Sequence, residues 1–355
     1  MRHPDHSRCH YDQVVTVPTK GDPGNVGWAI RDRVVRLRAF GTDRVFDLDQ
    51  AQYVIGSALD ATIRIDDPGV SRRHADLIAT DDGWTISDLG STNGIRRDGE
   101  EVKTFTLAPA VEIGFARTAV LIAESSQSVV LRGFLQRLLG WASEAQNGVD
   151  DAIRAIRQMS HLRAILVLRG DGALDGVGRL IHGLTLGADR PFSVCARDES
   201  GVAALHRACD GTLFLDGEEL PHDIEQVVVN LRLPENCTRL IVRVVTDDAM
   251  SEVASLSPHV AQVWVPALGG RTHDMDRVLL QYAEDAARKG RVGTALRPHD
   301  LKWVREGGVP THARAIEVMR RVVLARNWGI TGAAEREGIT PGAMTRYLQR
   351  AGIPS

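Results

Sequence analysis

Two short polar stretches, about 17 residues apart, carry the side chains best suited to binding an anion. The first places Ser71 and Arg72 after the turn at residues 67–69, and the second contains Thr92 and Asn93. Two hydroxyls, a guanidinium and an amide that converge at one end of a rigid scaffold suit a dianionic oxyanion on an extended peptide. Binding groups of this kind are usually carried by loops between rigid elements. The pattern therefore predicts an anion site built from two loops.

The elements around these loops are expected to be β-strands. Between residues 33 and 124 the chain contains short alternating segments rich in Val, Ile and aromatic residues, separated by Gly, Asp and Asn. The segments are "VVRLRAF", "RVFDLD", "QYVIG", "ATIRID", "HADLIAT", "GWTISDL" and "TAVLIAE". Strands at such even spacing predict a β-sandwich with its chemistry on the connecting loops.

The stretches "YVIG", "DATIRIDDPGVSRRHA" and "ISDLGSTNG" give residues 31–127 a family resemblance. In order and spacing they resemble the forkhead-associated (FHA) domain, a reader of phosphothreonine peptides. The resemblance implies phosphopeptide contacts from Ser71, Arg72, Ser91, Thr92 and Asn93. Ser71 and Thr92 would contact the phosphate, with Arg72 beside it, and Asn93 would hold the peptide backbone. It also implies structural roles for Gly56, His74 and Gly94.

One position departs from the family pattern. The family has Gly-Arg where this chain has Gly56-Ser57, and that arginine normally contacts the phosphate. A charge-assisted hydrogen bond contributes about 1.5–3 kcal/mol, so its loss could weaken binding about tenfold or more. Arg64 or Arg72 could substitute. The alternative is an FHA fold retained for protein contacts without phosphate recognition.

Residues 128–295 alternate between buried strands and amphipathic helices. "RAILVLRG", "GTLFLDG" and "RLIVRVV" are continuous apolar runs typical of a parallel sheet, which predicts an α/β domain. Several phrases resemble the AAA+ ATPase domain of NtrC-like activators that depend on the sigma-54 factor. The resemblance places a vestigial nucleotide site at Gly170, Gly176 and Asp216.

The chemical groups of an ATPase are missing from this segment. A phosphate loop needs G-x-x-x-x-G-K-[ST], but residues 170–179 contain neither lysine nor Ser/Thr. Gly217 stands where the family has its water-activating glutamate, and the sigma-factor contact loop has no room between residues 192 and 212. We therefore expect a degenerate scaffold without catalytic residues or cofactors.

The C-terminal part is expected to be helical. Residues 296–310 form a Pro- and Gly-bearing connector, and residues 311–355 show three helical patterns with a tight turn at Gly338. "GITGAAEREGITPGAMTRYLQRAGI" resembles the Fis-type helix-turn-helix of the same activators. Seven arginines against three glutamates give residues 311–355 a charge of +4. The implied DNA contacts are Thr331, Arg336, Gly342, Thr345, Arg346, Gln349 and Arg350. The alternative is a dimerisation module that does not bind DNA.

Composition sets the frame for the whole chain. The 355 residues suffice for two or three domains, and a net charge of −3 implies no particular partner. Residues 1–30 read as a flexible tail without a metal site, and no apolar run is long enough to span a bilayer. The four cysteines show no disulfide-framework spacing, so the expected compartment is the cytoplasm.

Together these features predict a non-enzymatic transcriptional regulator. Its expected partners are a phosphothreonine protein, such as a Ser/Thr kinase substrate, and double-stranded DNA, and it would act as at least a dimer without a membrane. The alternatives are an ATP-dependent sigma-54 activator and a phosphopeptide adaptor that does not bind DNA.

Overall fold

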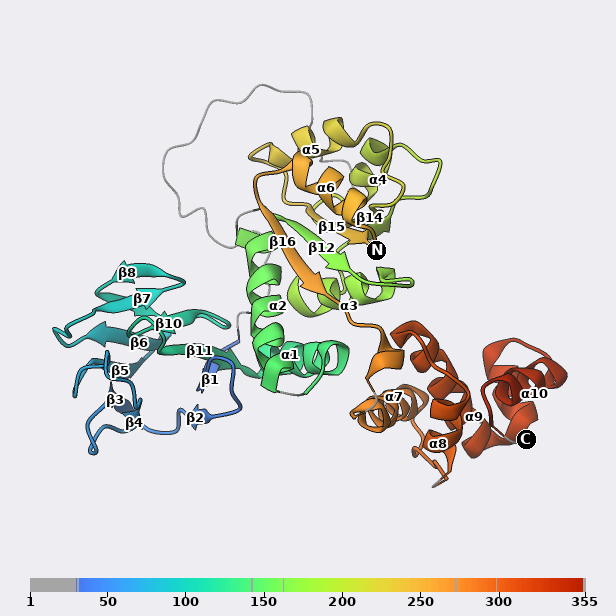
Figure 1. The fold of residues 1–355 in the computed structure, drawn as a ribbon, viewed down its shortest axis with the longest axis horizontal. Coiled ribbons are helices and arrows are strands. Elements are labelled where there is room, and N and C mark those ends of the chain that lie inside the picture. Colours follow the sequence, from blue (N-terminus) through green and yellow to red (C-terminus); the bar gives the residue numbers. More distant parts are fainter. Residues whose placement is uncertain are drawn as a thin grey trace, which may run out of the picture.

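The computed structural model describes residues 30, 32–141, 143–161, 163–271, 273–297 and 299–353. Figure 1 shows a β-sandwich, an α/β part and a helical C-terminal part. The predicted tail, residues 1–30, lies outside the described residues except for Ile30. Within the described residues, no helix is both long and apolar enough to cross a membrane. Cys209 is disulfide-bonded, which the cysteine spacing did not predict.

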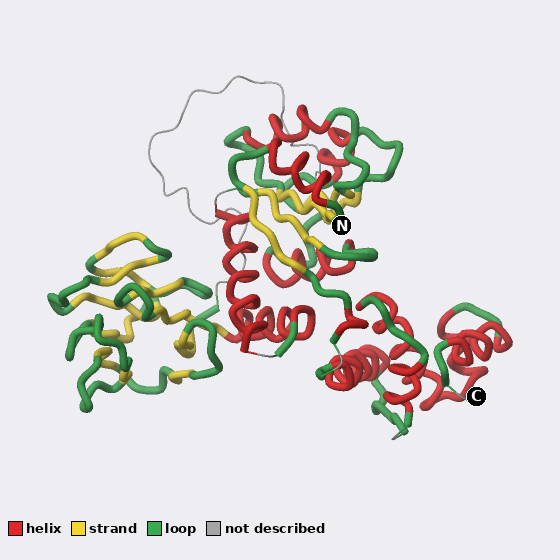
Figure 2. Tube along the Cα trace, viewed as in Figure 1, coloured by secondary structure: helices red, strands yellow, loops and turns green. Residues whose placement is uncertain are grey.

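Two sheets form the sandwich, which confirms the predicted β-fold (Figures 1 and 2). Alternating apolar residues such as Leu37, Ile55, Leu77 and Ile113 are fully buried between the sheets. The six-stranded sheet has the order β2 (Val45–Asp47), β1 (Val34–Ala39), β11 (Val120–Ser125), β10 (Glu112–Gly114), β7 (Ile95–Arg97), β8 (Glu100–Val102). The five-stranded sheet has the order β4 (Ile63–Arg64), β3 (Gln52–Gly56), β5 (Ala75–Thr80), β6 (Gly83–Asp88), β9 (Thr104–Thr106).

A second five-stranded sheet forms the centre of the α/β part, and all its pairings are parallel. Its order is β13 (Phe192–Val194), β14 (Thr212–Asp216), β15 (Arg239–Val244), β12 (Ile165–Arg169), β16 (Val260–Trp264). The apolar runs had predicted β12, β14 and β15, whereas β16 was missed because Gln262 interrupts its apolar sequence.

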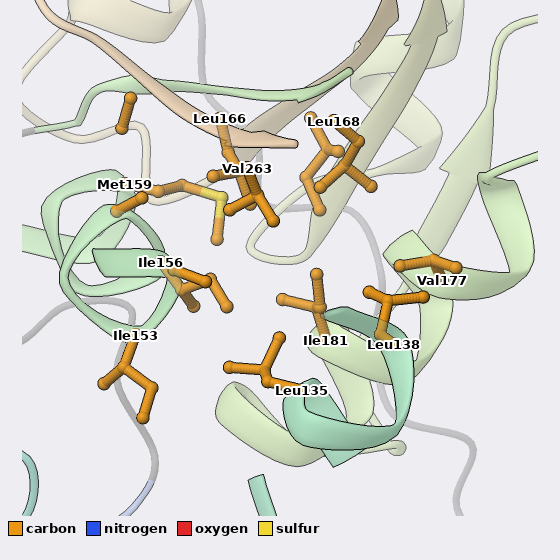
Figure 3. Packing of buried hydrophobic residues seen from close by; sticks show 14 of the residues in the cluster. Leu135, Leu138, Ile153, Ile156, Met159, Leu166, Leu168, Val177, Ile181 and Val263 are labelled. Carbon is orange, nitrogen blue, oxygen red and sulfur yellow. The ribbon is translucent and has the colours of Figure 1, made fainter. Parts of the chain in front are cut away.

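Helices cover both faces of this parallel sheet. One face packs α1 (Ser126–Leu139), α2 (Ser143–His161) and α3 (Asp175–Thr185), as Figure 3 shows for Leu135, Ile156 and Ile181. The other face packs α4 (Gly201–Arg207), α5 (Ile224–Arg232) and α6 (Asp247–Leu256). Two separate apolar clusters therefore hold the sheet, as expected for a sheet buried on both faces.

The sandwich continues into the α/β part without an intervening loop. Ser125 is the last residue of β11 and the N-cap of α1, where it forms a capping box with Ser128. The fully buried Arg38 donates from Nε to Glu124 at 2.7 Å and from Nη1 to Asp150 of α2 at 3.0 Å. In addition, Arg154 and Arg157 of α2 pair with Glu112 and Asp98. Ion pairs and a continuous backbone thus fix α2 against the six-stranded sheet.

One apolar core holds the helical C-terminal part, from Leu268 to Ile353. It contains a 3-10 turn (Leu268–Gly270), α7 (Met275–Gly290), α8 (Asp300–Glu306), α9 (His312–Glu337) and α10 (Pro341–Arg350). Helix α7 falls within the segment 128–295 that was predicted as one α/β domain, but it shares a core with α9 and not with the parallel sheet. This packing differs from the predicted division of the chain at residues 295 and 311.

The predicted connector, residues 296–310, is a folded part of that core. Helix α8 lies within it, Val304 and Val309 are buried, and the buried Asp300 pairs with Arg326 of α9 at 2.6 Å. The prediction of a plain linker was therefore wrong. The Pro and Gly residues are signals for a loop, whereas the spacing of Leu301 and Val304 is that of a short helix.

A kink divides α9 at Gly329, which has a φ of 66° and separates the two predicted helices. The turn before α10 agrees with the sequence: Gly338 adopts a φ of 66°, and Thr340 caps α10 by accepting from the Ala343 amide. Pro341 is the first residue of the helix, where its missing N–H costs nothing.

Candidate functional site

The loops 65–74 and 89–94 meet at one end of the sandwich and bring the predicted polar residues together. Ser71 and Thr92 are 21 residues apart in the chain, yet their hydroxyls lie 3.4 Å from each other. The Ser71 hydroxyl also accepts from the Thr92 amide at 3.1 Å. Thr92 is exposed and Ser71 is half-buried, so both hydroxyls border solvent. The arrangement offers two adjacent hydroxyl groups to an incoming anion.

His74 ties the two loops together from beneath. It is fully buried, and its ring meets Phe115 edge-on at a centroid distance of 5.5 Å. Its Nδ1 accepts from the Ser71 amide at 3.0 Å, which leaves the proton on Nε2 to donate to the Gly94 carbonyl at 3.0 Å. The imidazole therefore fixes Ser71 and Gly94 relative to each other.

Ser91 and Asn93 make hydrogen bonds within the two loops. The Ser91 hydroxyl donates to Asp88 at 2.5 Å and accepts from the Gly94 amide at 2.9 Å. The Asn93 amide group donates to the Gly69 carbonyl at 2.7 Å, although the side chain as a whole remains exposed. Ser91 thus shapes its own loop, whereas Asn93 joins the loops and keeps its amide oxygen available.

Gly56 and Ser57 hold the 65–74 loop against the end of β3. A Cβ on Gly56 would lie 2.1 Å from the Arg72 carbonyl oxygen, so only glycine fits. The Ser57 hydroxyl donates to the Val70 carbonyl at 2.8 Å. Ser57 therefore braces the loop from the position where the family carries its phosphate-contacting arginine.

Three arginines lie next to this position. Arg72 and Arg73 are exposed, directly follow Ser71, and form no ion pair with the described residues. On the neighbouring strand, Arg64 is paired in register with Gly56 and is 43% exposed. Its separation of 3.9 Å from Asp66 is too long for a strong hydrogen bond. Both segments whose backbone pairs with residues 56–58 therefore carry an exposed arginine.

A family model for the FHA domain matches residues 53–116, the segment that contains both loops. Those residues form an FHA domain. The chain is 30% identical to the FHA domain-containing protein FhaA of Mycobacterium tuberculosis over 82 residues, which are 23% of this chain and 16% of FhaA. It is 37% identical to FhaB of Mycolicibacterium smegmatis over 79 residues, which are 22% of this chain and 50% of FhaB. This chain thus spans half or less of the length of these curated relatives.

Solved structures of FHA domains are also similar to part of this chain. One from a study of phosphothreonine-dependent FHA domain interactions is 30% identical, covers 25% of this chain and 94% of that chain, and has a TM-score of 0.24.

In the α/β part, an ion pair between Arg243 and Asp216 lies where the sequence predicted a vestigial nucleotide site, in the wall of a cavity of about 420 Å³. Arg243, at the end of β15, donates to both carboxylate oxygens of Asp216 at 2.9 and 3.1 Å, and from Nε to the Gly172 carbonyl at 3.1 Å. The loop after β12 thus presents at least one carbonyl to Arg243, whereas phosphate binding needs amides that point at the ligand. The Asp216 carboxylate is thus paired with the Arg243 guanidinium.

Other residues of this site are also engaged in the fold. Glu218 accepts from the amides of Val245 and Thr246, which lowers its pKa and makes it part of the turn before α6. Gly170 packs against the Val265 carbonyl, which a Cβ would approach to 2.5 Å, while Gly176 borders open space. Within the described residues, no cluster of three or more His, Cys, Asp or Glu could hold a metal ion.

The predicted DNA-contacting residues are distributed over α9 and α10. The exposed ones are Thr331, Arg336, Gly342, Arg346, Gln349 and Arg350. Thr345 is half-buried and donates from its hydroxyl to the Pro341 carbonyl at 3.1 Å. Arg336 lies 3.8 Å over the ring of Trp328. On α10, therefore, Arg346 and Arg350 carry the accessible charge.

Two further residues shape the FHA site: Asp67, which the sequence placed only in the turn at 67–69, and Asp88, which the sequence analysis did not name. Asp88 accepts from Gly90 and Ser91, and Asp67 accepts from the Gly69 amide at 2.7 Å and the Thr118 hydroxyl at 2.5 Å. The Thr118 and Gly69 contacts lower the pKa of Asp67. Asp followed two residues later by Gly is a signal for such turns, and it is present at both positions.

Proposed function

We propose that the FHA domain reads a phosphothreonine peptide through Ser71, Thr92 and the arginines beside them. The observation that carries the proposal is the pair of hydroxyls 3.4 Å apart on two loops that His74 locks together. A site that is already ordered loses little entropy when it binds an extended ligand. The match of the FHA family model to residues 53–116 supports the same ligand class, as does the 30% identity to a domain from a study of phosphothreonine-dependent FHA domain interactions.

Arg72 or Arg64 would supply the charge that Ser57 lacks. Arg72 follows Ser71 directly and is exposed, and Arg64 lies across from Gly56 in the register of β3 and β4. A guanidinium that contacts a phosphate oxygen forms a charge-assisted hydrogen bond, about twice as strong as a neutral one. Arg72 and Arg64 are thus the principal specificity residues for phosphate in this proposal.

Replacing Ser71 by alanine should weaken phosphothreonine-peptide binding at least about tenfold. The substitution removes one phosphate contact and the acceptor of the Thr92 amide, which are together worth more than about 1.4 kcal/mol. Binding to a phosphothreonine peptide library, followed by titration of the best peptide, measures the effect. Ser87→Ala is the matched control because its hydroxyl pairs with that of Thr104 on β9 and not with a residue of either loop.

The proposal fails if no phosphopeptide binds the wild-type chain, or if Ser71→Ala binds the selected peptide as well as Ser87→Ala does. An unphosphorylated peptide that binds with equal affinity would instead assign the domain to protein contacts without phosphate recognition.

For the whole chain we propose a non-enzymatic transcriptional regulator that binds DNA through α9 and α10 as an oligomer, at least a dimer. The support is the +4 charge of residues 311–355, the tight turn at Gly338 and the capped start of α10. Exposed residues near the start of such a helix are placed to reach base edges. The α/β part would act as the scaffold between phosphopeptide and DNA.

Alanine at both Arg346 and Arg350 should weaken duplex binding and reduce its salt dependence. Each lost phosphate contact lowers the slope of log K against log salt by about 1. Fluorescence anisotropy with a mixed-sequence duplex at several salt concentrations measures the slope. Arg288→Ala on α7 is the control, because this arginine is 78% exposed but lies outside the two helices. An unchanged slope in the double variant, or no binding at any salt, would favour the adaptor alternative.

Purified chain should show no magnesium-dependent ATP turnover above background. Asp216 is paired with Arg243, Glu218 is used in a turn, and the loop 170–179 has no lysine. A coupled ATPase assay measures turnover. Hydrolysis that disappears in Asp216→Asn would reverse this proposal in favour of an ATP-driven activator.

A further inference from the structure

The cavity of about 420 Å³ beside the Arg243–Asp216 pair lies at the carboxyl edge of the parallel sheet. Its walls come from the loop after β12, the first residue of α3, the segments after β13 and β14, and the end of β15. Open α/β sheets bind their ligands in the crevice outside the carboxyl ends of the strands. The volume is in the range of small-molecule sites. The cavity is independent of the FHA domain and of the proposed phosphopeptide function.

The charged side chains in the wall of this cavity pair with one another, with one exception. Arg243 donates to both carboxylate oxygens of Asp216, and Arg197 forms an ion pair with Glu219 at 2.5 Å. Asp175, the first residue of α3, lines the cavity and is half-buried. Within the described residues, its carboxylate forms no hydrogen bond and no ion pair. The wall therefore carries one negative charge that nothing in it compensates.

This unpaired carboxylate disfavours an anion and favours a cation. Asp175 stands at the start of α3, where a phosphate would otherwise bind the free amides of the helix, and its charge repels an anion there. The two guanidiniums of the wall already have carboxylate partners. Within the described residues, no group of three or more His, Cys, Asp or Glu could hold a metal ion. An organic ammonium, in contrast, needs a single carboxylate as its partner.

Apolar surface lies next to these charges. Val194, at the end of β13, lines the cavity and is 40% exposed. Cys195 follows it, is half-buried, and has a thiol whose pKa is raised by burial, so the thiol is uncharged. Leu174, from the loop after β12, adds a third apolar side chain to the wall. A ligand in the cavity thus meets one free carboxylate and an uncharged surface.

We propose that this cavity binds a small organic cation, a primary amine with a compact apolar body. The ammonium group would pair with the Asp175 carboxylate, and the body would pack against Val194 and Cys195. The Arg243–Asp216 pair would stay intact as part of the wall. The ligand class therefore differs from a nucleotide in both charge and size.

Phenethylamine and 2-phenylethanol serve as probes at pH 7, because they share an aromatic body and differ in the ammonium group. Cys195 reports occupancy, since it lines the cavity and its thiol is free. Phenethylamine should slow the alkylation of Cys195 by iodoacetamide in the full chain in a saturable way, as measured by mass spectrometry. Cys237 is the internal control, because it is also free and half-buried but does not line the cavity. Protection by 2-phenylethanol should need a concentration at least about tenfold higher.

Asp175→Asn should weaken phenethylamine binding at least about tenfold and leave 2-phenylethanol binding within about twofold of wild type. Asparagine keeps the size of the side chain and is favourable at a helix start, so α3 is preserved. Asp171→Asn is the matched control, since Asp171 lies on the preceding loop, is exposed and does not line the cavity.

If Asp175→Asn does not fold, the comparison of the two probes on the wild-type chain still decides the question. The proposal is overturned if neither probe protects Cys195 in a saturable way, or if both protect it at equal concentration. Equal binding of phenethylamine to Asp175→Asn and Asp171→Asn would overturn it as well. Protection of Cys195 by magnesium-ATP at a lower concentration than by phenethylamine would overturn it in favour of a nucleotide site.

Discussion

Replacing Asp150 by alanine should lower the free energy of unfolding by about 3–5 kcal/mol. Asp150 is 1% exposed, receives both terminal nitrogens of Arg38, and accepts from the Gly41 amide at 2.7 Å. Its loss leaves the fully buried Arg38 with Glu124 as its remaining carboxylate. Removing one partner of a buried ion pair lowers the free energy of unfolding by far more than the intact pair contributes to it, because the remaining charge stays buried without a partner.

The midpoint of urea unfolding for the full chain measures this loss. Asp151→Ala is the matched control: its side chain is 60% exposed, and it pairs with Arg154 one turn along the helix. A surface pair of that kind contributes about 0–1 kcal/mol. The combined replacement of Arg38 by methionine and Asp150 by leucine should recover most of the loss, because neither member of the pair is then left as a buried charge and Glu124 keeps its ion pair with Arg36 at 2.8 Å. Equal midpoints for Asp150→Ala and Asp151→Ala would refute the buried-pair argument.

Gly56→Ala should reduce phosphopeptide affinity more than tenfold and destabilise the FHA domain by about 1–3 kcal/mol. A methyl group there would lie 2.1 Å from the Arg72 carbonyl oxygen and 3.0 Å from that of Ser71, so the loop must move away from β3. That movement breaks the bond from the Ala58 amide to the Arg72 carbonyl and shifts Ser71 away from Thr92.

Two measurements on Gly56→Ala separate the effects. Peptide titration reports the site, and thermal unfolding reports the domain. Gly133→Ala is the control, because Gly133 lies on α1 and no atom is within 4 Å of the added methyl. This variant should lower neither the affinity for the peptide nor the unfolding temperature. An affinity for the peptide equal to that of Gly133→Ala would show that the contact between β3 and the loop does not position Ser71.

The sequence predicted the FHA domain because its signals are local. Alternating strands, the turn at 67–69 and the "STNG" loop each follow from residue types within a few positions. The convergence of Ser71 and Thr92 was expected, but their distance was not, since it depends on His74 bridging two loops 20 residues apart. The commitment of Ser57 to the Val70 carbonyl likewise needs three-dimensional information.

Long-range packing accounts for most of what the sequence did not reveal. Asp300 in the expected connector is buried only because Arg326 comes from another helix. Similarly, Arg243 on β15 contacts Asp216, its register partner on β14, and the Gly172 carbonyl, and no pattern around "RLIVRVV" indicates these contacts. Such pairs join residues about 26 to 71 positions apart, beyond the reach of periodicity.

The direct junction at Ser125 fixes the position of the FHA loops relative to the α/β part, and therefore the position of any phosphoprotein that these loops bind. Two recognition modules on a flexible tether engage their targets over a range of spans, with an effective concentration that the tether length sets. Here β11 passes directly into α1, and Arg38, Arg154 and Arg157 clamp α2 to the sheet, so the reach of the FHA loops is fixed. The gain in avidity from a second contact would then depend steeply on whether the distance between the two target sites matches this fixed spacing.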